Sequence, residues 1–362
     1  MKTQTLSSLA LAALLAGCGG GGGGSKNGSG SGSGSGTSYA STFTITATDD
    51  LTAGGIDLEG HIVAVVAQSP SDGVVSSLGY YPASAGKSIT FPTGYTLDYV
   101  YGVSGHFAIF VAKDSSGTEG VLILNVDKNV STFESGRDIQ AADGDRIMTS
   151  TFGEGGNTDF KIETFNSGSA SVSSTKSVAL PTGVTPIALA GDYLLVNNVQ
   201  FRAHGRAARR ARLAKRDNGD FSLYSTSGTK VVDYAGPTGT TLKIVYNINA
   251  SGQAVGAVDA TSGTVGVSWD KSGKATVLPG GGLNVVADSV TDGGRIVGTY
   301  VPSTTDASQN VAVSFSGGKE TTLTALGSGF GLAGISRNGA GIGIFSYDDD
   351  AGTATITAYT VK

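Results

Sequence analysis

The sequence has a single cysteine, Cys18, among its 362 residues. No disulfide can form within one chain, so the fold must be held by its core alone. Charge is also scarce: charged residues make up 15% of the sequence, against roughly 25% in average soluble proteins. Glycine, in contrast, occurs 57 times. This composition is typical of many short strands joined by turns, and the net charge of −5 argues against a general affinity for nucleic acid.

The N-terminal segment lacks an apolar run long enough to span a membrane. Its stretch from Leu6 to Ala16 offers about 11 residues where a bilayer needs roughly 20. Lys2 precedes this stretch, and Leu15-Ala16-Gly17-Cys18 follows it. That order is typical of a cleavable signal peptide, here residues 1–17.

The four residues Leu15-Ala16-Gly17-Cys18 resemble the lipobox of bacterial lipoproteins. The resemblance implies that Cys18 becomes the mature N-terminus and carries several acyl chains, such as palmitate, which together give stable anchoring. An ordinary signal peptide with an incidental cysteine is the alternative. Gly19 after Cys18, in place of Asp, resembles the outer-membrane-sorted majority and leaves the membrane face open.

Residues 18–37 form the expected tether between the anchor and the folded domain. Gly19 to Gly24 and the alternating stretch from Ser29 to Gly36 cannot bury apolar surface. About 20 such residues reach on the order of 25 Å. We therefore expect a lipid-anchored protein of the cell envelope whose folded domain covers residues 38–362.

A four-strand unit repeats along this domain, and its clearest copy runs from Ile244 to Leu278. Alternating strands are expected over 244–249, 254–259, 264–270 and 275–278, with Ser-Gly turns at 251–252 and 272–273. Two such residues between β-formers predict a hairpin, because glycine supplies the positive φ that the turn requires.

The first-turn glycines of the copies fall at a near-constant spacing. The intervals are 45, 39, 47, 61, 42 and 45 residues between Gly60, Gly105, Gly144, Gly191, Gly252, Gly294 and Gly339. Four-stranded units at about 40 to 45 residues are the signature of a β-propeller. The sequence thus predicts an all-β fold, a seven-bladed β-propeller of four-stranded antiparallel blades. Six or eight blades stay open, while two β-sandwich domains would not explain one continuous period.

The last copy lacks a fourth strand. It ends with the expected strand over 353–361, whereas the alternating segment Thr42 to Thr48 has no place in the first copy. Pairing the two would remove open sheet edges. We therefore expect the N-terminal strand to close the last blade.

The segments Asn249 to Gly256 and Asp292 to Gly298, each followed by an aromatic residue at Trp269 or Phe315, resemble the HAF-type extracellular repeats of bacteria. The His-Ala-Phe tripeptide of that family is absent. The resemblance implies architecture and no catalytic activity.

Candidate catalytic and metal residues are few. His61 and His106 occupy equivalent turn positions in adjacent copies, and no histidine follows His204, so neither zinc nor a Ser-His-Asp site is expected. The acidic loop Asp348, Asp349 and Asp350 is a weak calcium candidate, although the spaced EF-hand pattern is missing. No cofactor and no catalytic residue is predicted. Carboxylates brought together across blades keep one alternative open, a carbohydrate-active enzyme such as a glycosidase or lyase.

A basic insertion at residues 202–217 stands apart from the repeat. It explains the interval of 61 residues and holds seven of the 24 basic residues: Arg202, Arg206, Arg209, Arg210, Arg212, Lys215 and Arg216. A short helix with an alanine face, a disordered loop and an internal lid are all compatible with its sequence. As an anion-binding segment it favours an anionic polysaccharide, lipopolysaccharide or envelope protein as partner. The main prediction is a monomeric binding or scaffold module, tethered to a membrane by lipid.

Overall fold

The computed structural model describes a chain of strands and turns. It covers residues 39–48, 51–56, 62–67, 75–81, 87–89, 91–153, 156–198, 220–279, 284–302, 309–316, 319–323, 326, 328, 331–348 and 353–361. Within these ranges, no helix is long and apolar enough to cross a membrane. The expected signal peptide, Cys18, the tether and the basic insertion at 202–217 lie outside them.

The described strands form seven four-stranded sheets, and every strand pair is antiparallel. The first three sheets in chain order are β2 (Leu51–Ile56) to β5 (Lys87–Ile89), β6 (Tyr95–Ser104) to β9 (Val130–Ser135), and β10 (Arg137–Asp143) to β13 (Val172–Val178). Between their ends lie β3 (Ile62–Ala67), β4 (Val75–Tyr81), β7 (Phe107–Asp114), β8 (Glu119–Asn125), β11 (Arg146–Gly153) and β12 (Gly156–Phe165).

The next three sheets repeat the pattern of four consecutive strands. They comprise β14 (Thr185–Ala190), β15 (Tyr193–Asn197), β16 (Phe221–Ser225) and β17 (Lys230–Asp233); β18 (Thr241–Ile248), β19 (Ala254–Ala260), β20 (Gly263–Trp269) and β21 (Ala275–Val277); and β22 (Val285–Val290), β23 (Ile296–Tyr300), β24 (Val311–Ser316) and β25 (Lys319–Thr322).

The last sheet joins the two ends of the described chain. It contains β26 (Gly331–Ile335), β27 (Gly341–Asp348), β28 (Thr353–Val361) and, at its edge, β1 (Tyr39–Thr48). The pairing of β1 with β28 runs from Tyr39 opposite Val361 to Thr48 opposite Thr353.

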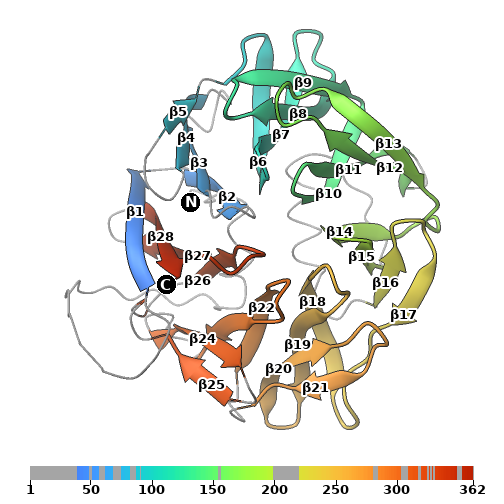
Figure 1. Cartoon of the computed structure of the whole chain (residues 1–362), viewed down its shortest axis with the longest axis vertical. Coiled ribbons are helices and arrows are strands. Elements are labelled where there is room, and N and C mark those ends of the chain that lie inside the picture. The colour runs from blue at the N-terminus through green and yellow to red at the C-terminus, as the bar shows by residue number, and fades with distance from the viewer. Residues whose placement is uncertain are drawn as a thin grey trace, which may run out of the picture.

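The sheets stand in a ring around a common centre (Figure 1). The innermost strands β2, β6, β10, β14, β18 and β22 contact one another in that order, and β26 contacts both β22 and β2. The expected all-β propeller with four-stranded antiparallel blades is confirmed.

The aligned glycines occupy the turns where they were expected. Six of the seven are described, and their φ angles lie between 53° and 81°: Gly105, Gly144, Gly191, Gly252, Gly294 and Gly339. Gly60 lies outside the described residues. An L-residue with a side chain adopts this backbone conformation only at an energetic cost, so the glycine spacing reports a real structural repeat.

A side-chain oxygen fastens several of these turns. The Oδ1 atom of Asn249 accepts the backbone N–H groups of Ser251 at 3.1 Å and Gln253 at 3.0 Å. The Oδ1 atom of Asp270 accepts those of Ser272 at 2.9 Å and Lys274 at 3.0 Å. Such side-chain bonds favour the turn over continued pairing of the strands.

The core lies between neighbouring sheets. Trp269 is fully buried, packs at 5.6 Å between ring centroids against Tyr234 of the preceding sheet, and donates its Nε1–H to the carbonyl of Ala235 at 2.8 Å. Phe107 and Ile109 of β7 likewise share one cluster with Ile147 and Phe165 of the next sheet. Apolar burial between the flat faces thus holds the ring together.

Candidate functional site

The ring has two different ends, which we call the turn rim and the loop rim. The turn rim carries the turns between first and second and between third and fourth strands. Backbone hydrogen bonds join these two turns within a sheet, from Val126 N–H to the His106 carbonyl at 3.0 Å and from Thr226 N–H to the Asp192 carbonyl at 2.9 Å. The loop rim, at the opposite end, carries the connections between second and third strands.

At the centre of the turn rim, Arg337 links sheets that stand on opposite sides of the ring. It lies in the turn between β26 and β27. Its Nε is 3.3 Å from Asp143 Oδ1 and its Nη1 is 3.6 Å from Asp292 Oδ1, while Nη2 donates to the carbonyl of Leu189. The partners belong to the sheets that begin with β10, β22 and β14, whose places in the ring Figure 1 shows, so one side chain contacts three sheets besides its own.

A second arginine completes this group. Arg146 pairs with Asp143 through Nη2 and donates from Nη1 to the Gly191 carbonyl at 2.7 Å. Asp143 also accepts the Gly191 N–H at 3.0 Å. We call Asp143, Arg146, Asp292 and Arg337 the central charge bridge.

The central charge bridge is neutral overall, and its inner pair is largely shielded from water. The side chains of Arg337 and Asp143, at its centre, are 17% and 9% exposed, whereas those of Arg146 and Asp292 are 29% and 44% exposed. Burial lowers the pKa of the Arg337 guanidinium, and the nearby carboxylates of Asp143 and Asp292 oppose that shift. Because both arginines already have carboxylate partners, this group is suited to joining sheets rather than to capturing a ligand.

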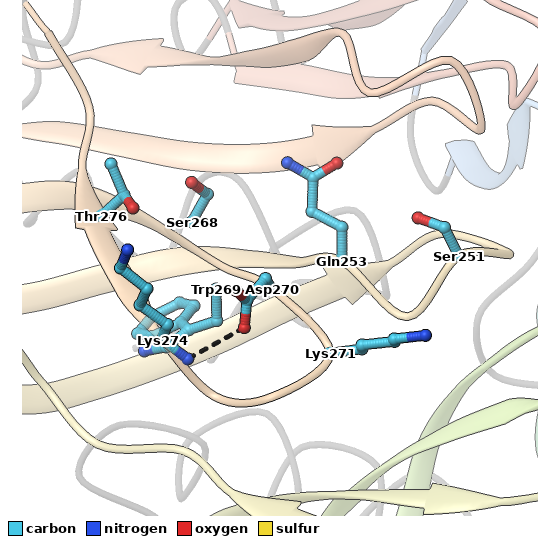
Figure 2. A pocket seen from close by; sticks show the side chains of 8 residues that line it. All are labelled: Ser251, Gln253, Ser268, Trp269, Asp270, Lys271, Lys274 and Thr276. Atoms are coloured by element: carbon cyan, nitrogen blue, oxygen red, sulfur yellow. Dashed lines mark hydrogen bonds between the residues drawn. The ribbon is translucent and has the colours of Figure 1, made fainter.

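A polar pocket of about 360 Å³ opens on the turn rim beside the β18–β21 sheet (Figure 2). Its lining residues come from one sheet and its two turns: Ser251, Gln253, Ser268, Trp269, Asp270, Lys271, Lys274 and Thr276. Ser268 and Thr276 are direct neighbours across β20 and β21. The pocket therefore displays hydroxyl, amide and ammonium groups side by side.

Two carboxyl groups meet between the sheets that begin with β6 and β10. Glu134 lies on β9 and Glu163 on β12, and burial together with the neighbouring Glu163 raises the pKa of Glu134 to about 8. Glu134 Oε1 and Glu163 Oε2 are buried and have no hydrogen-bond partner. Because burial and like charge both disfavour a second negative charge, one carboxyl of the pair holds a proton.

The predicted site residues fall largely outside the described residues. This holds for Cys18, for Arg202, Arg206, Arg209, Arg210, Arg212, Lys215 and Arg216, and for Asp349 and Asp350. Asp348 ends β27, but its side chain is not described. Among the described residues, no group of three or more His, Cys, Asp or Glu side chains is placed to hold a metal ion.

The described member of the predicted histidine pair is His106. Its Nδ1 lies 2.6 Å from Asp127 Oδ2, and the two side chains are 36% and 40% exposed. His106 is therefore a surface residue of the turn rim with a carboxylate partner of its own.

The insertion leaves and re-enters the fold at a closed neck on the loop rim. Asn198 N–H donates to the Asp220 carbonyl at 2.8 Å, and Asn198 Nδ2 donates to Ser222 Oγ at 2.8 Å. Immediately inside the neck, Asn197 pairs with Phe221. The insertion therefore interrupts neither β15 nor β16.

The sequence analysis did not predict the central charge bridge, although a sequence pattern indicates it. Asp143 directly precedes an aligned first-turn glycine, Asp292 lies two residues before one, and Arg337 two residues before another. Charged residues at equivalent turn positions must gather on one rim of a propeller. The pocket had no comparable signal, because two strands and two turns contribute to it.

Comparisons with known proteins support the fold. No family model matches the chain, and no curated protein matches it. Among solved structures, the Dos1 propeller is 8% identical with a TM-score of 0.51, over 89% of this chain and 95% of that one. A prolyl endopeptidase is 14% identical with a TM-score of 0.52, over 89% of this chain and 50% of that one.

A puromycin hydrolase is 12% identical with a TM-score of 0.51, over 83% of this chain and 51% of that one. This chain thus spans about half the length of either hydrolytic enzyme. At identities this low, the likeness establishes a β-propeller fold and carries no activity over to this chain.

Proposed function

We propose that this protein is a lipid-anchored binding or scaffold module of the cell envelope. Its basic insertion, residues 202–217, contacts an anionic polysaccharide, lipopolysaccharide or an acidic envelope protein. The observation that carries the proposal is the closed neck at Asn198 and Asp220. The pairing of β15 with β16 continues up to that neck, so the insertion does not interrupt either strand.

Charge gives the insertion a function that the rest of the molecule lacks. The chain carries −5 in total, and without the seven cations of the insertion it would carry −12. The remainder is therefore repelled by anionic surfaces, and the insertion supplies the attraction. Six of its seven cations are arginines, whose planar guanidinium suits phosphate and carboxylate oxygens.

The test replaces Arg206, Arg209, Arg210 and Arg212 with serine and measures binding to lipopolysaccharide and to anionic polysaccharide across a salt series. We expect binding at least tenfold weaker and a shallower salt dependence, because fewer ionic contacts form. A matched control removes four cations elsewhere, at Lys113, Lys128, Lys161 and Lys230. Unchanged binding in the arginine variant together with a lowered melting temperature would instead favour an internal lid.

The anchor part of the proposal rests on the sole cysteine. Replacing Cys18 with alanine removes the only thiol able to carry thioether-linked lipid. We expect the variant to be unprocessed or released from membranes on cell fractionation. A variant that is as membrane-bound as the parent would disprove lipid anchoring.

We further propose that the ring works as seven blades and that β1 closes the last one. The long pairing of β1 with β28 supports this, since β28 would otherwise present an open edge. Deleting residues 38–50 should then lower the melting temperature of the whole domain, although the segment resembles an expendable extension. An unchanged cooperative melting transition would disprove closure.

A further inference from the structure

The polar pocket beside the β18–β21 sheet is a second candidate ligand site. None of its lining residues belongs to the basic insertion. We propose that the pocket binds a hydroxyl-rich carboxylate, the chemistry of a uronic acid residue. Its volume of about 360 Å³ lies within the range of small-molecule sites. Its lining places Lys274 on the side of Ser268 and Thr276 and Lys271 on the side of Ser251, so hydroxyl and amide groups lie between the two lysines (Figure 2).

The charge comes from Lys271 and Lys274 in the turn between β20 and β21. Both side chains are exposed, and among the described residues neither ammonium has a carboxylate within ion-pair distance. The pocket's one acid, Asp270, already uses its Oδ1 atom to fasten the turn by accepting from Ser272 and Lys274 N–H groups. These hydrogen bonds, that of the Ser272 hydroxyl first, lower the pKa of Asp270. Two ammoniums against one carboxylate leave a net charge of about +1 for an anion.

The hydrogen-bonding groups lie along one face of the sheet. Ser268 and Thr276 are cross-strand neighbours, and Gln253 stands just before β19 on the same face. The side-chain carbonyl of Gln253 accepts from Asn249 Nδ2 at 3.2 Å, which leaves the Gln253 amide N–H groups to donate to a ligand. The Ser251 hydroxyl donates to Asn249 Oδ1 at 2.7 Å, which leaves its oxygen to accept. A sugar ring, whose hydroxyls both donate and accept, matches this mixture.

Two features of the pocket favour a sugar acid over other ligands. A bare phosphate would satisfy the ammoniums but would leave the hydroxyl face at Ser268 and Thr276 without a partner. An aromatic or apolar ligand would need a stacking surface, and Trp269 cannot provide one because it is fully buried against Tyr234. Hydrogen bonds and one carboxylate therefore define the ligand.

The pocket and the neck of the basic insertion lie on opposite rims. The proposal for the pocket and the proposal for the insertion can therefore be tested independently. The pocket belongs to the turn rim, between turns of one sheet, whereas the neck of the insertion lies on the loop rim.

The test is calorimetric titration of the full chain with glucuronate or galacturonate, with glucose and galactose as neutral counterparts and with inorganic phosphate. We expect a uronate to bind at least tenfold more tightly than its neutral counterpart and than phosphate. The variant with Lys271→Ser and Lys274→Ser should lose at least tenfold in uronate affinity. The control variant with Lys128→Ser and Lys230→Ser removes two exposed lysines from the corresponding turns of other sheets and should bind as the parent does.

The variant that lacks Arg206, Arg209, Arg210 and Arg212 should retain uronate binding, which separates this test from that of the insertion. Melting temperatures of all variants check that folding is intact. Uronate affinity equal to that for phosphate, or equal in the parent and in the Lys271/Lys274 variant, would overturn the proposal.

Discussion

The two rims of this propeller differ in what their residues contact. At the turn rim, turns of different sheets bond to one another, as between Ala250 N–H and Asp292 Oδ1 at 2.9 Å and throughout the central charge bridge. At the loop rim, the bonds of Asp114 stay within its own loop, where it accepts from Ser116 and Thr118, and the Asn284 N–H bonds to the Thr264 carbonyl of the preceding sheet at 2.7 Å. The turn rim therefore fixes the sheets relative to one another, while the loop rim accommodates an insertion at a closed neck.

The largest effect should follow from breaking the central charge bridge. Replacing Arg337 with methionine keeps an unbranched side chain but leaves Asp143, only 9% exposed, with one fewer cation. Removing one partner of a buried pair costs about 3 kcal/mol at the lower end of the usual range, and Asp143 keeps Arg146. Urea unfolding followed by the fluorescence of the single tryptophan, Trp269, measures the loss.

The control for this change is Lys230→Met. Lys230 pairs with Asp233 at 3.1 Å, but the two side chains are 50% and 61% exposed. Such a surface pair contributes less than about 1 kcal/mol. Equal losses in Arg337→Met and Lys230→Met would mean that the central charge bridge does not hold the ring. A cycle with Asp143→Asn then tests whether the two residues act as a pair, since their effects should be non-additive.

A smaller contrast should separate two glycines on the opposite rims. Both have positive φ angles, 53° at Gly191 on the turn rim and 82° at Gly117 on the loop rim. A Cβ at Gly191 would lie 3.0 Å from atoms of Ala250 in the next sheet, whereas a Cβ at Gly117 would meet nothing within 4 Å. We expect Gly117→Ala to cost about 1 kcal/mol through the backbone alone. Gly191→Ala should cost about 2 kcal/mol, because crowding is added.

Thermal unfolding of the two variants measures this contrast. The φ of Gly191 lies closer to the left-handed minimum than that of Gly117, so backbone strain alone predicts the opposite order. A greater loss in Gly117→Ala would therefore show that contact between turns contributes little.

The repeat could be predicted from the sequence because its signals are local. Alternation within Ala254 to Ala260 and the Ser-Gly turn before it act over a few residues, and the aligned glycines have the predicted φ angles. The third-strand aromatic Trp269 also lies in the core, as its place in the alternation indicates. Periodicity and turn chemistry thus determined both the unit and the fold class.

The central charge bridge could not be derived in the same way. Arg337 and Asp143 are 194 positions apart, and their contact depends on the diameter of the assembled ring. The pocket likewise depends on the register between β20 and β21, which places Ser268 opposite Thr276. Both features depend on how strands and sheets assemble in space, so the sequence of a single repeat unit does not predict them.

The smallest expected effect lies between the rims, where Glu134 and Glu163 meet. Burial and the neighbouring Glu163 raise the pKa of Glu134 from 4.5 to about 8 in the folded protein, while the charges of Arg137 and the hydrogen bond from Thr149 oppose the shift. Arg137 itself is bonded to Asp159, which Lys161 also approaches at 3.5 Å. Between pH 4.5 and 8 the folded chain therefore holds more protons than the unfolded chain.

By linkage, the free energy of unfolding must fall as pH rises through that window. We expect a decline of about 1 kcal/mol between pH 5 and pH 8, since solvent and nearby charges screen the pair. Glu134→Gln keeps an N–H donor for Glu163 and cannot ionise, so it should flatten the decline and stabilise the protein at pH 8. Glu320→Gln on β25 serves as the control and should keep the slope of the parent. Thermal unfolding at pH 5, 6, 7 and 8 measures the stability of the parent and of both variants. If the stability of Glu134→Gln declines as steeply as that of the parent, the carboxyl pair is not the proton-binding group.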